Sequence, residues 1–363
     1  MKGLILAGGH GTRLRPLTHT GNKHMLPVAN RPILYWGLEN LRDAGVKEVG
    51  IILGPIKEGI EEGVGDGARF GLRVTYITQG EPKGLADAIL CAREFLGNDP
   101  FLMYLGDNML EHGVRPYMER FAMGDASAVV GAVPVKDPTH YGVVELGPAD
   151  AIRSIEEKPK SPRSNLALIG AYLFSPEVHE VVRGLKPSAR GELEITDAIR
   201  VLEERTHRVK VLHLDGWWKD TGQPEDLLEA NERVMASRPP RFFEVKGEID
   251  PLAHVSGHVA LGHGGRIAAG CTVRGPVVLG ERVQVEDGAY VGPYTAVGDG
   301  SVVRHAEVER SILMEDVVID VQTRVVDSIL GRGCRLLQRE HRPQGAAFVI
   351  GDAGRVLLPV PHK

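Results

Sequence analysis

The feature that most limits the fold of this chain is a six-residue repeat in its C-terminal third. Every sixth residue from Val255 to Val303 is aliphatic, and the residues two places earlier are small or β-branched. The aliphatic set is Val255, Leu261, Ile267, Val273, Leu279, Val285, Val291, Val297 and Val303, and the second set is Ala253, Val259, Gly265, Cys271, Val277, Val283, Ala289, Thr295 and Ser301. Such a repeat places one inward apolar side chain on each short strand, and stacked coils bury a column that no single repeat could bury. The repeat therefore predicts a parallel β-helix.

The pattern resembles that of hexapeptide-repeat proteins, and this resemblance implies a left-handed β-helix with three hexads in each coil. About three coils are regular, and the register becomes irregular from Glu309. The residues expected to continue the solenoid are Ile312, Val318, Val325 and Ile329. The segment 348–358 is typical of a hairpin, and we expect it to cap the end of the solenoid.

The N-terminal two thirds of the chain follow another pattern, in which short apolar runs alternate with amphipathic stretches. The expected strands are 4–7, 49–53, 74–77 and 101–105, followed by 143–146, 151–155 and 168–174; the expected helices are one that begins after Pro32 and others at 84–95, 176–182, 194–204 and 224–235. This alternation predicts an α/β domain with a mainly parallel sheet. The later strands are more closely spaced and indicate an antiparallel or mixed insertion.

Two consecutive prolines, Pro239 and Pro240, separate the two patterns. They cannot continue a helix, because each lacks a backbone donor and fixes φ. We therefore expect a catalytic domain at residues 1–236, a linker at 237–247, and a β-helix domain with its cap at 248–363.

Composition argues against several classes of protein. No apolar run approaches the about 20 residues of a membrane span, and the run at Met1–Ala7 is too short for a signal peptide. The three cysteines, Cys91, Cys271 and Cys334, form no CxxC pair, and a net charge of −5 with scattered signs gives no basic stripe for nucleic acid. We therefore expect a cytoplasmic protein with no nucleic-acid or membrane partner. A homo-oligomer is a separate expectation that composition does not establish.

A glycine-rich segment follows the first predicted strand. Gly8, Gly9 and Gly11 let the backbone approach a ligand and direct N–H groups at phosphate oxygens. The segment lacks the Gly-Lys-Ser/Thr ending of a P-loop and the third glycine of a dinucleotide fingerprint. Glycines at such a turn also occur as plain connections, so the segment by itself predicts only a backbone that can bind phosphate.

Three cations follow the glycines at Arg13, Arg15 and Lys23, where they would face a triphosphate. The string GGxGTRLxPxT at 8–18, with Lys23-His24-Met25-Leu26-Pro27-Val28 after it, resembles the sugar-phosphate nucleotidylyltransferases. The resemblance implies a Rossmann-like nucleotidyltransferase domain with a mixed sheet. It assigns nucleotide binding to Gly8, Gly9, Gly11, Thr12 and Arg13, and catalytic roles to Arg13 and Lys23.

Two aspartates stand at the ends of apolar strands, which is where open α/β sheets place their ligands. Asp107 ends the run from Leu102, and Asp220 follows Trp217-Trp218-Lys219. Mg²⁺ binds proteins through one or two carboxylates and completes its shell with phosphates and water. The pair resembles the two metal carboxylates of the family, so we expect Asp107 and Asp220 to hold Mg²⁺.

The family resemblance also assigns residues to the sugar phosphate and to the base. Glu157 and Lys158 belong to a Glu-Lys-Pro element, in which Pro159 is expected to hold Lys158 in extended backbone. The further residues that match the sugar pocket are Tyr141, Gly142, Asn165, Gly170 and Glu192, and those that match the nucleobase site are Gln79 and Gly84. Each of these residues could equally serve packing or a turn.

The strings Gly106-Asp107-Asn108 and Lys23–Pro32 most resemble the long-form thymidylyltransferases of this family, which implies dTTP and glucose 1-phosphate as substrates. UTP or another sugar 1-phosphate is the nearest alternative. In-line attack on the α-phosphorus needs alignment and charge stabilisation rather than a nucleophilic side chain. A second alternative is acetyl transfer in the β-helix; its candidate bases are His254, His258, His263 and His305. We prefer a structural role for the β-helix.

Overall fold

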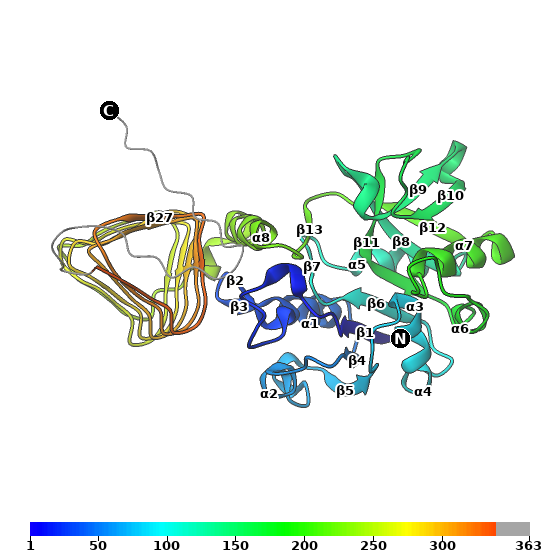
Figure 1. The fold of residues 1–363 in the computed structure, drawn as a ribbon, viewed down its shortest axis with the longest axis horizontal. Helices are drawn as coiled ribbons and strands as arrows, with labels where there is room; N and C mark the ends of the chain where they lie inside the picture. Colours follow the sequence, from blue (N-terminus) through cyan, green and yellow to red (C-terminus); the bar gives the residue numbers. More distant parts are fainter. Residues whose placement is uncertain (339–363) are drawn as a thin grey trace.

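The computed structural model describes residues 1–338 and contains an α/β part and a β-helix. A nine-stranded mixed sheet forms the centre of the α/β part, with the order β10-β9-β11-β6-β1-β4-β5 and with β8 and β12 joined through β11 (Figure 1). Its strands are β1 (Lys2–Ala7), β4 (Glu48–Leu53), β5 (Arg73–Thr78), β6 (Phe101–Leu105), β8 (Ala128–Pro134), β9 (Gly142–Leu146), β10 (Ile152–Glu157), β11 (Leu166–Phe174) and β12 (Val209–His213). Strands β1, β4, β5 and β6 run parallel, whereas β11 is antiparallel to β6 and to β8. The predicted mixed α/β sheet is therefore confirmed.

Helices cover both faces of this sheet. The helices are α1 (Ile33–Asp43), α2 (Ile60–Val64), α3 (Leu85–Cys91), α4 (Arg93–Leu96), α5 (Arg115–Phe121), α6 (Val178–Arg183), α7 (Ile195–Thr206) and α8 (Pro224–Ser237). Alternate residues of β1 show the two faces, since Leu4 and Leu6 pack with α3, α6 and α7, whereas Ile5 packs with α1 and α2. The single helix expected at 84–95 is divided at Ala92, whose backbone leaves the helical run. None of these helices is long and apolar enough to cross a membrane.

The C-terminal part is a left-handed β-helix built from three parallel sheets, seen as a stack of triangular coils in Figure 1. Its strands are β14 (Glu248–Ile249), β15 (His254–Ser256), β16 (Val259–Leu261), β17 (Arg266–Ile267), β18 (Thr272–Arg274), β19 (Val277–Leu279), β20 (Gln284–Glu286), β21 (Tyr290–Val291), β22 (Thr295–Val297), β23 (Val302–Arg304), β24 (Glu307–Glu309), β25 (Ile312–Leu313), β26 (Val318–Asp320), β27 (Arg324–Val326), β28 (Ile329–Leu330) and β29 (Arg335–Leu337). Glu248 pairs with Arg266 and Val259 with Val277, so three hexads make one coil. From Leu261 to Val303 the predicted inward residues are buried in one apolar column.

The later coils are shorter than the hexad rule predicts. Tyr290 pairs with Glu307 and Ala296 with Ile312, so the register has already changed before Glu309, where the sequence first shows it. The solenoid continues, but in β25, β26 and β28 the side chain in the inner apolar column is one residue later than expected. Leu313, Ile319 and Leu330 pack in that column, whereas Ile312 and Ile329 belong to a second apolar cluster and Val318 is only partly covered. The hairpin expected at 348–358 lies outside the described residues.

The α/β part and the β-helix meet along one side of the solenoid. Helix α8 and the hairpin of β2 (Pro27–Val28) and β3 (Arg31–Pro32) lie between the sheet and the coils in Figure 1. Residues 244–246 already pair with Leu261, so the chain joins the β-helix soon after the predicted boundary prolines. One apolar cluster spans the junction, and it includes Val28, Ala230 and Val234 together with Val278 and Ala296 of the solenoid.

Candidate active site

The glycine segment lies at the end of β1 and leaves little room for side chains. A Cβ on Gly9 would lie 3.1 Å from Cε of Lys23, and Gly11 has a φ of 61° in the left-handed region. A Cβ on Gly54, which follows β4, would lie 2.2 Å from the carbonyl oxygen of Gly8. The two backbones therefore approach closely, and they hold the loop over the carboxyl ends of the parallel strands.

Lys23 is fixed by a short turn of helix at Lys23–Met25. Asn22 caps this turn by accepting a hydrogen bond from the backbone N–H of His24 at 2.9 Å. The Lys23 Nζ donates to Oδ2 of Asp107, and the two side chains are only 13% and 14% exposed. The structure therefore brings the predicted catalytic lysine and one predicted metal ligand together.

Antiparallel pairing of two short strands brings the two aspartates together. Strand β13 (Trp218–Asp220) pairs with β7 (Asn108–Leu110) so that Asp220 lies opposite Asn108. Thr221 then donates to the backbone oxygen of Asp107 from its N–H at 3.0 Å and from its hydroxyl at 2.7 Å. These bonds join the end of β6 to the start of α8 and fix both carboxylates at one site.

The two carboxyl groups have opposite pKa shifts. Burial and the charge of Asp107 raise the pKa of Asp220 to about 7. Burial also opposes ionisation of Asp107, but the Lys23 ammonium outweighs it and lowers the Asp107 pKa below its usual range. Burial disfavours the ionised form of both carboxyl groups, and a bound cation would favour that form at Asp220 as the charges of Lys23 and Arg13 do.

A divalent cation fits this arrangement. Within residues 1–338, no three or more His, Cys, Asp or Glu side chains group closely enough to hold a metal ion by themselves. Mg²⁺ does not require such a group, because it commonly uses one or two carboxylates with substrate phosphates and water. Asp107 and Asp220 match that requirement, and Mg²⁺ at these residues remains a prediction.

His24 is buried beside Lys23, and we expect its burial to make the free energy of unfolding depend on pH. Burial, followed by the charge of Lys23, lowers the pKa of His24 to about 3, and its Nδ1 lies 2.6 Å from Oδ1 of Asn22. Asn22 uses its amide to donate to the backbone oxygens of Ala7 and Ile56, so its Oδ1 is left as the acceptor and His24 Nδ1 as the donor.

Between the folded pKa of about 3 and the unfolded value of 6.5, the unfolded chain binds a proton at His24 that the folded protein excludes. The stability contributed by neutral His24 is therefore complete above the unfolded value and is lost as the pH falls. We expect the free energy of unfolding to drop by about 2 kcal/mol through this residue between pH 7 and pH 5. Urea denaturation at both pH values should show a smaller drop for His24→Asn than for the wild type. Equal drops would contradict the assignment, and the exposed His263→Asn serves as the control.

Arg13 faces the same site from the first helical turn. A Cβ on Gly222 would lie 2.7 Å from Nη2 of Arg13, and the charge of Arg13 acts on Asp220. Gly222 therefore leaves space for the guanidinium beside β13. Thr12 and Arg15 are exposed in the same turn.

The residues expected at the nucleobase lie at the other side of the glycine segment. The Oε1 atom of Gln79 lies 3.4 Å from the position of a Cβ on Gly8, and Gln79 Nε2 donates to Asp87 at 2.9 Å. Gly84 has a φ of 107°, and a Cβ there would lie 2.4 Å from the backbone oxygen of Leu193. The backbone of Gly84 thus lies close to the backbone of Leu193, and this packing requires glycine whether or not a nucleobase binds there.

Glu157 and Gly142 lie opposite each other in the β9–β10 pair. A Cβ on Gly142 would lie 3.2 Å from Oε2 of Glu157, and Thr196 donates to the same oxygen at 3.1 Å. Burial and the nearby Glu194 raise the pKa of Glu157. The structure therefore places this carboxylate, with Gly142 beside it, in a mostly enclosed position.

The prediction of an extended backbone at Lys158 was wrong. Lys158 has a φ of 45°, in the left-handed region, although Pro159 was expected to favour an extended conformation. The reason is local, because β10 ends at Glu157 and the Lys158 N–H turns to donate to the backbone oxygen of Tyr141 at 2.9 Å. The Lys158 ammonium is exposed and lies 3.9 Å from Glu157.

Aromatic and amide groups connect the sugar side to the aspartates. Tyr141 meets Trp218 edge to face at 5.5 Å between ring centroids, and burial with the charge of Asp220 raises the Tyr141 pKa. Trp218 Nε1 donates to Oδ1 of Asn108 at 2.6 Å, and the same oxygen accepts from the backbone N–H of Gly170 at 3.2 Å. Gly170 is therefore brought to the site through Asn108.

Two predicted sugar-site residues have weaker positions. Asn165 is exposed before β11, and its backbone oxygen accepts from Val135 at 2.9 Å. The carboxylate of Glu192 is held by Arg190 at 2.6 Å. The structure does not bring Asn165 or Glu192 into contact with the aspartate pair.

Sequence reasoning assigned no role to several residues that organise the site. Arg190 lies 3.9 Å from Glu157 and 3.2 Å from the buried Glu194, so it links the carboxylates at the sugar side. No local pattern marks this arginine. Asn108 and Trp218 stand next to the two predicted metal ligands, and that adjacency was the available signal.

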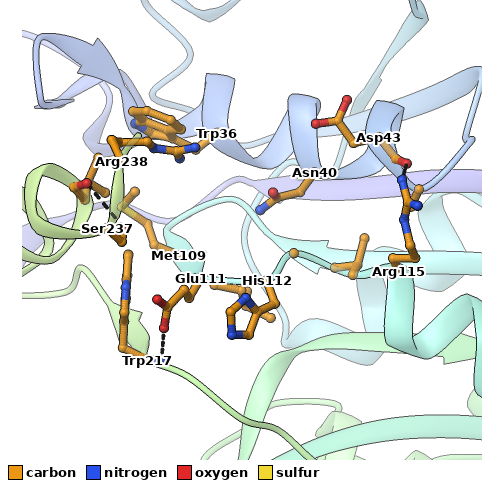
Figure 2. Close-up of a pocket in the computed structure, with 15 residues that line it drawn as sticks. Trp36, Asn40, Asp43, Met109, Glu111, His112, Arg115, Trp217, Ser237 and Arg238 are labelled. Carbon is orange, nitrogen blue, oxygen red and sulfur yellow. Dashed lines mark hydrogen bonds between the residues drawn. The ribbon is translucent and has the colours of Figure 1, made fainter. Parts of the chain in front are cut away.

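Two cavities of the α/β part differ in whether predicted site residues line them. One, of about 550 Å³, is lined by Trp218, by Tyr141, which was predicted for the sugar pocket, and by Asp220, which was predicted as a metal ligand. The other, of about 350 Å³, lies between α1, β7 and the end of α8, where Trp36, Glu111 and Trp217 line it (Figure 2). No predicted site residue lines the second cavity, so the first is the candidate for substrate.

The four histidines proposed for acetyl transfer are all exposed on the β-helix. His258 stacks on Phe243 at 5.2 Å between ring centroids. His305 Nδ1 lies 2.9 Å from Asp320, and its Nε2 lies 4.0 Å from Asp287. Both ring nitrogens of His305 therefore face carboxylates of the solenoid itself.

Comparison with known proteins agrees with this geometry. Residues 2–237 match the family described as nucleotidyl transferase, and residues 273–353 match the GMPPB C-terminal domain. A glucose-1-phosphate thymidylyltransferase of Streptomyces antibioticus is 42% identical over 98% of this chain and 99% of its own length.

Two solved structures also match. The structure of a glucose-1-phosphate thymidylyltransferase from Bacillus anthracis, in complex with a sucrose, is 39% identical and covers 64% of this chain and 94% of its own, with a TM-score of 0.60. A UDP-glucose pyrophosphorylase complexed with UDP-glucose is 27% identical and covers 65% of this chain and 99% of its own, with a TM-score of 0.59. With a glycine loop, a lysine and an aspartate pair at the ends of a mixed sheet, and with most of its length matched, the chain belongs to the nucleotidyl transferase family.

Proposed function

We propose that this protein transfers a nucleotidyl group from dTTP to glucose 1-phosphate, forming dTDP-glucose and releasing pyrophosphate. The observation that carries this proposal is the cluster of Lys23, Asp107 and Asp220 at the glycine loop of a nucleotidyl transferase fold. The similarity to a thymidylyltransferase over nearly the whole chain supports the choice of substrates.

The proposed reaction is an in-line displacement. A phosphate oxygen of glucose 1-phosphate attacks the α-phosphorus of the triphosphate, the bond to the β-phosphate oxygen breaks, and pyrophosphate leaves. Arg13 and Lys23 would neutralise the charge that develops on the phosphates, and the glycine loop would orient them through its N–H groups. Asp107 and Asp220 would hold Mg²⁺, which when bound would neutralise further phosphate charge.

The sugar phosphate would bind beside Tyr141 and Glu157. The exposed ammonium of Lys158 can reach an anionic phosphate, whereas the enclosed Glu157 carboxylate can accept hydrogen bonds from sugar hydroxyls. Trp218 closes the same side with an aromatic face. This arrangement separates a cationic position for phosphate from an acceptor position for hydroxyls.

The base would lie near Gln79. Its side-chain amide offers a donor and an acceptor, as the edge of a pyrimidine requires. Gln79 Nε2 donates to Asp87 and to the backbone oxygen of Gly84, and these two bonds orient the amide. Thymine and uracil share this edge, which makes UTP the competing substrate.

Pyrophosphate release should be measured with Mg²⁺ across a matrix of nucleoside triphosphates and sugar 1-phosphates. We expect dTTP with glucose 1-phosphate to give the highest kcat/KM. A higher value with UTP, or with another sugar 1-phosphate, would reject the proposed substrates but keep nucleotidyl transfer. If no pair supports release, the proposed function itself fails.

A further inference from the structure

The hairpin that follows Lys23 ends in a turn that touches the β-helix. Ala29 and Asn30 form its two-residue tip, with φ values of 50° and 58°, while Val28 pairs with Arg31. Positive φ at both central residues is the geometry of a type I′ turn, which asparagine tolerates. The tip therefore projects rigidly from the base of the hairpin.

Two asparagine side chains bond this tip to the solenoid. Asn30 Nδ2 donates to the backbone oxygens of Val297 at 2.6 Å and Val278 at 3.2 Å, which belong to neighbouring coils. Asn231 of α8, only 1% exposed, accepts from the N–H of Ala29 at 2.8 Å and donates to the oxygen of Tyr294 at 2.8 Å. One network thus joins the hairpin, α8 and the β-helix.

Apolar packing reinforces the same contact. Val28 is fully buried and Ala29 is 4% exposed, and they belong to one cluster with Val278, Ala296 and Ile312 of the solenoid. A contact that combines buried apolar surface with hydrogen bonds from two amide side chains restricts relative motion far more than a flexible linker would. The β-helix therefore holds the tip of the hairpin in one position.

The two segments that make this contact, the β2–β3 hairpin and α8, both continue to the aspartate pair, and each is called an arm of the contact. At the base of the hairpin, Leu26 donates from its N–H to the oxygen of Lys23 at 3.1 Å and accepts from Ile33 at 3.1 Å. On the other arm, α8 begins after Thr221, which is bonded to Asp107. A shift of the solenoid would thus move Lys23 and Asp220 relative to each other.

We propose that the β-helix is a positioning part of the nucleotidyl-transfer site, and that Asn30 and Asn231 are the positioning residues through which it acts. This inference depends on the proposed function, because it assigns the two asparagines a role in the same site. Neither residue touches the reacting groups. They act by keeping the Lys23 turn and the start of α8 in register.

Asn30→Gly separates positioning from turn formation. Glycine adopts positive φ readily, so the hairpin should survive while both bonds to the solenoid are lost. Because a displacement of about 1 Å at a transfer site costs up to a hundredfold in rate, we expect kcat to fall about tenfold with both KM values within about twofold. Amide hydrogen exchange should become faster at residues 23–28.

Asn231→Asp tests the second arm of the network. Aspartate keeps the acceptor for the Ala29 N–H but loses the donor to Tyr294, so we expect a fall in kcat of similar size. Gln284→Ala is the matched control, because Gln284 also spans two backbone oxygens of the solenoid, those of Gly264 and Arg282, away from the junction. It should keep the wild-type kcat.

The outcomes distinguish the two claims. If Asn30→Gly and Asn231→Asp both keep the wild-type kcat and the wild-type rate of amide hydrogen exchange at residues 23–28, the positioning role is overturned, even if the melting temperature falls. A wild type that releases no pyrophosphate would reject the proposed function, whereas faster exchange at residues 23–28 in Asn30→Gly would still support positioning of the Lys23 turn by the β-helix. If Gln284→Ala loses as much kcat as the two asparagine variants, the loss comes from general destabilisation of the solenoid and the inference is rejected.

Discussion

Asp107→Asn and Asp220→Asn should each lower kcat by about a thousandfold or more, because each removes a negative ligand from the site where phosphate charge must be neutralised. The two variants should differ in stability. Asn at 107 leaves Lys23 mostly buried without its carboxylate, and we expect a loss of about 3 kcal/mol in the free energy of unfolding. Asn at 220 removes the carboxyl group whose pKa is raised to about 7, so stability should be unchanged or higher.

Pyrophosphate release at saturating Mg²⁺ measures the first effect, and urea denaturation in EDTA at pH 8 measures the second. Asp99→Asn is the control, since Asp99 is 58% exposed and lies 3.9 Å from Lys2 at the far end of β1. Full activity in either variant would remove that aspartate from the proposed metal site. A loss of stability in Asp220→Asn as large as that in Asp107→Asn would contradict the electrostatic description of the pair.

Lys23→Met should lower kcat by about a hundredfold or more, because it removes the ammonium that faces both the glycine loop and Asp107. Methionine retains an unbranched side chain as far as Cε, so the packing of that atom against Gly9 is preserved. Without the ammonium, two carboxylates face each other and one of them must bind a proton more tightly. We therefore expect added Mg²⁺ to raise the melting temperature more in Lys23→Met than in the wild type.

Steady-state kinetics and thermal melts with and without Mg²⁺ test this prediction. Lys57→Met provides the control, since Lys57 is 52% exposed and pairs with Glu61 on the surface. If Lys23→Met lowered only the affinity for triphosphate and left kcat intact, Lys23 would be a binding residue without a role in the transfer step. An equal response of both variants to Mg²⁺ would contradict the coupling of Lys23 to the aspartates.

The β-helix could be predicted because its period is fixed by geometry, and the buried residues from Leu261 to Val303 confirm that period. The shortened coils could not be placed in the same way. The sequence shows only that the six-residue register fails at Glu309, and the pairing of Tyr290 with Glu307 shows which coil is shortened first. The division of the helix expected at 84–95 was missed because Ala92 is itself a good helix former.

The positions of Asp107 and Asp220 at the ends of strands could be predicted because Asp107 follows the apolar run from Leu102 and Asp220 follows Trp217-Trp218-Lys219, and their role as metal ligands stays a prediction. The contact of Trp218 with Asn108 could not be predicted, because it depends on pairing between strands 110 residues apart. The prediction for the Lys158 backbone was wrong for a related reason. The local preference imposed by a following proline is weak, and a hydrogen bond to Tyr141 overrides it.

The α/β part contacts the solenoid over β19, β22 and β25, which belong to successive coils. In a solenoid each coil contacts only its neighbours, so opening normally starts at a free end and proceeds coil by coil. Here the side contact ties the middle coils to α8 and the hairpin as one cooperative unit. A substrate that stabilises the α/β part should therefore protect the amides of β19, β22 and β25 from exchange, while those of β29 gain little.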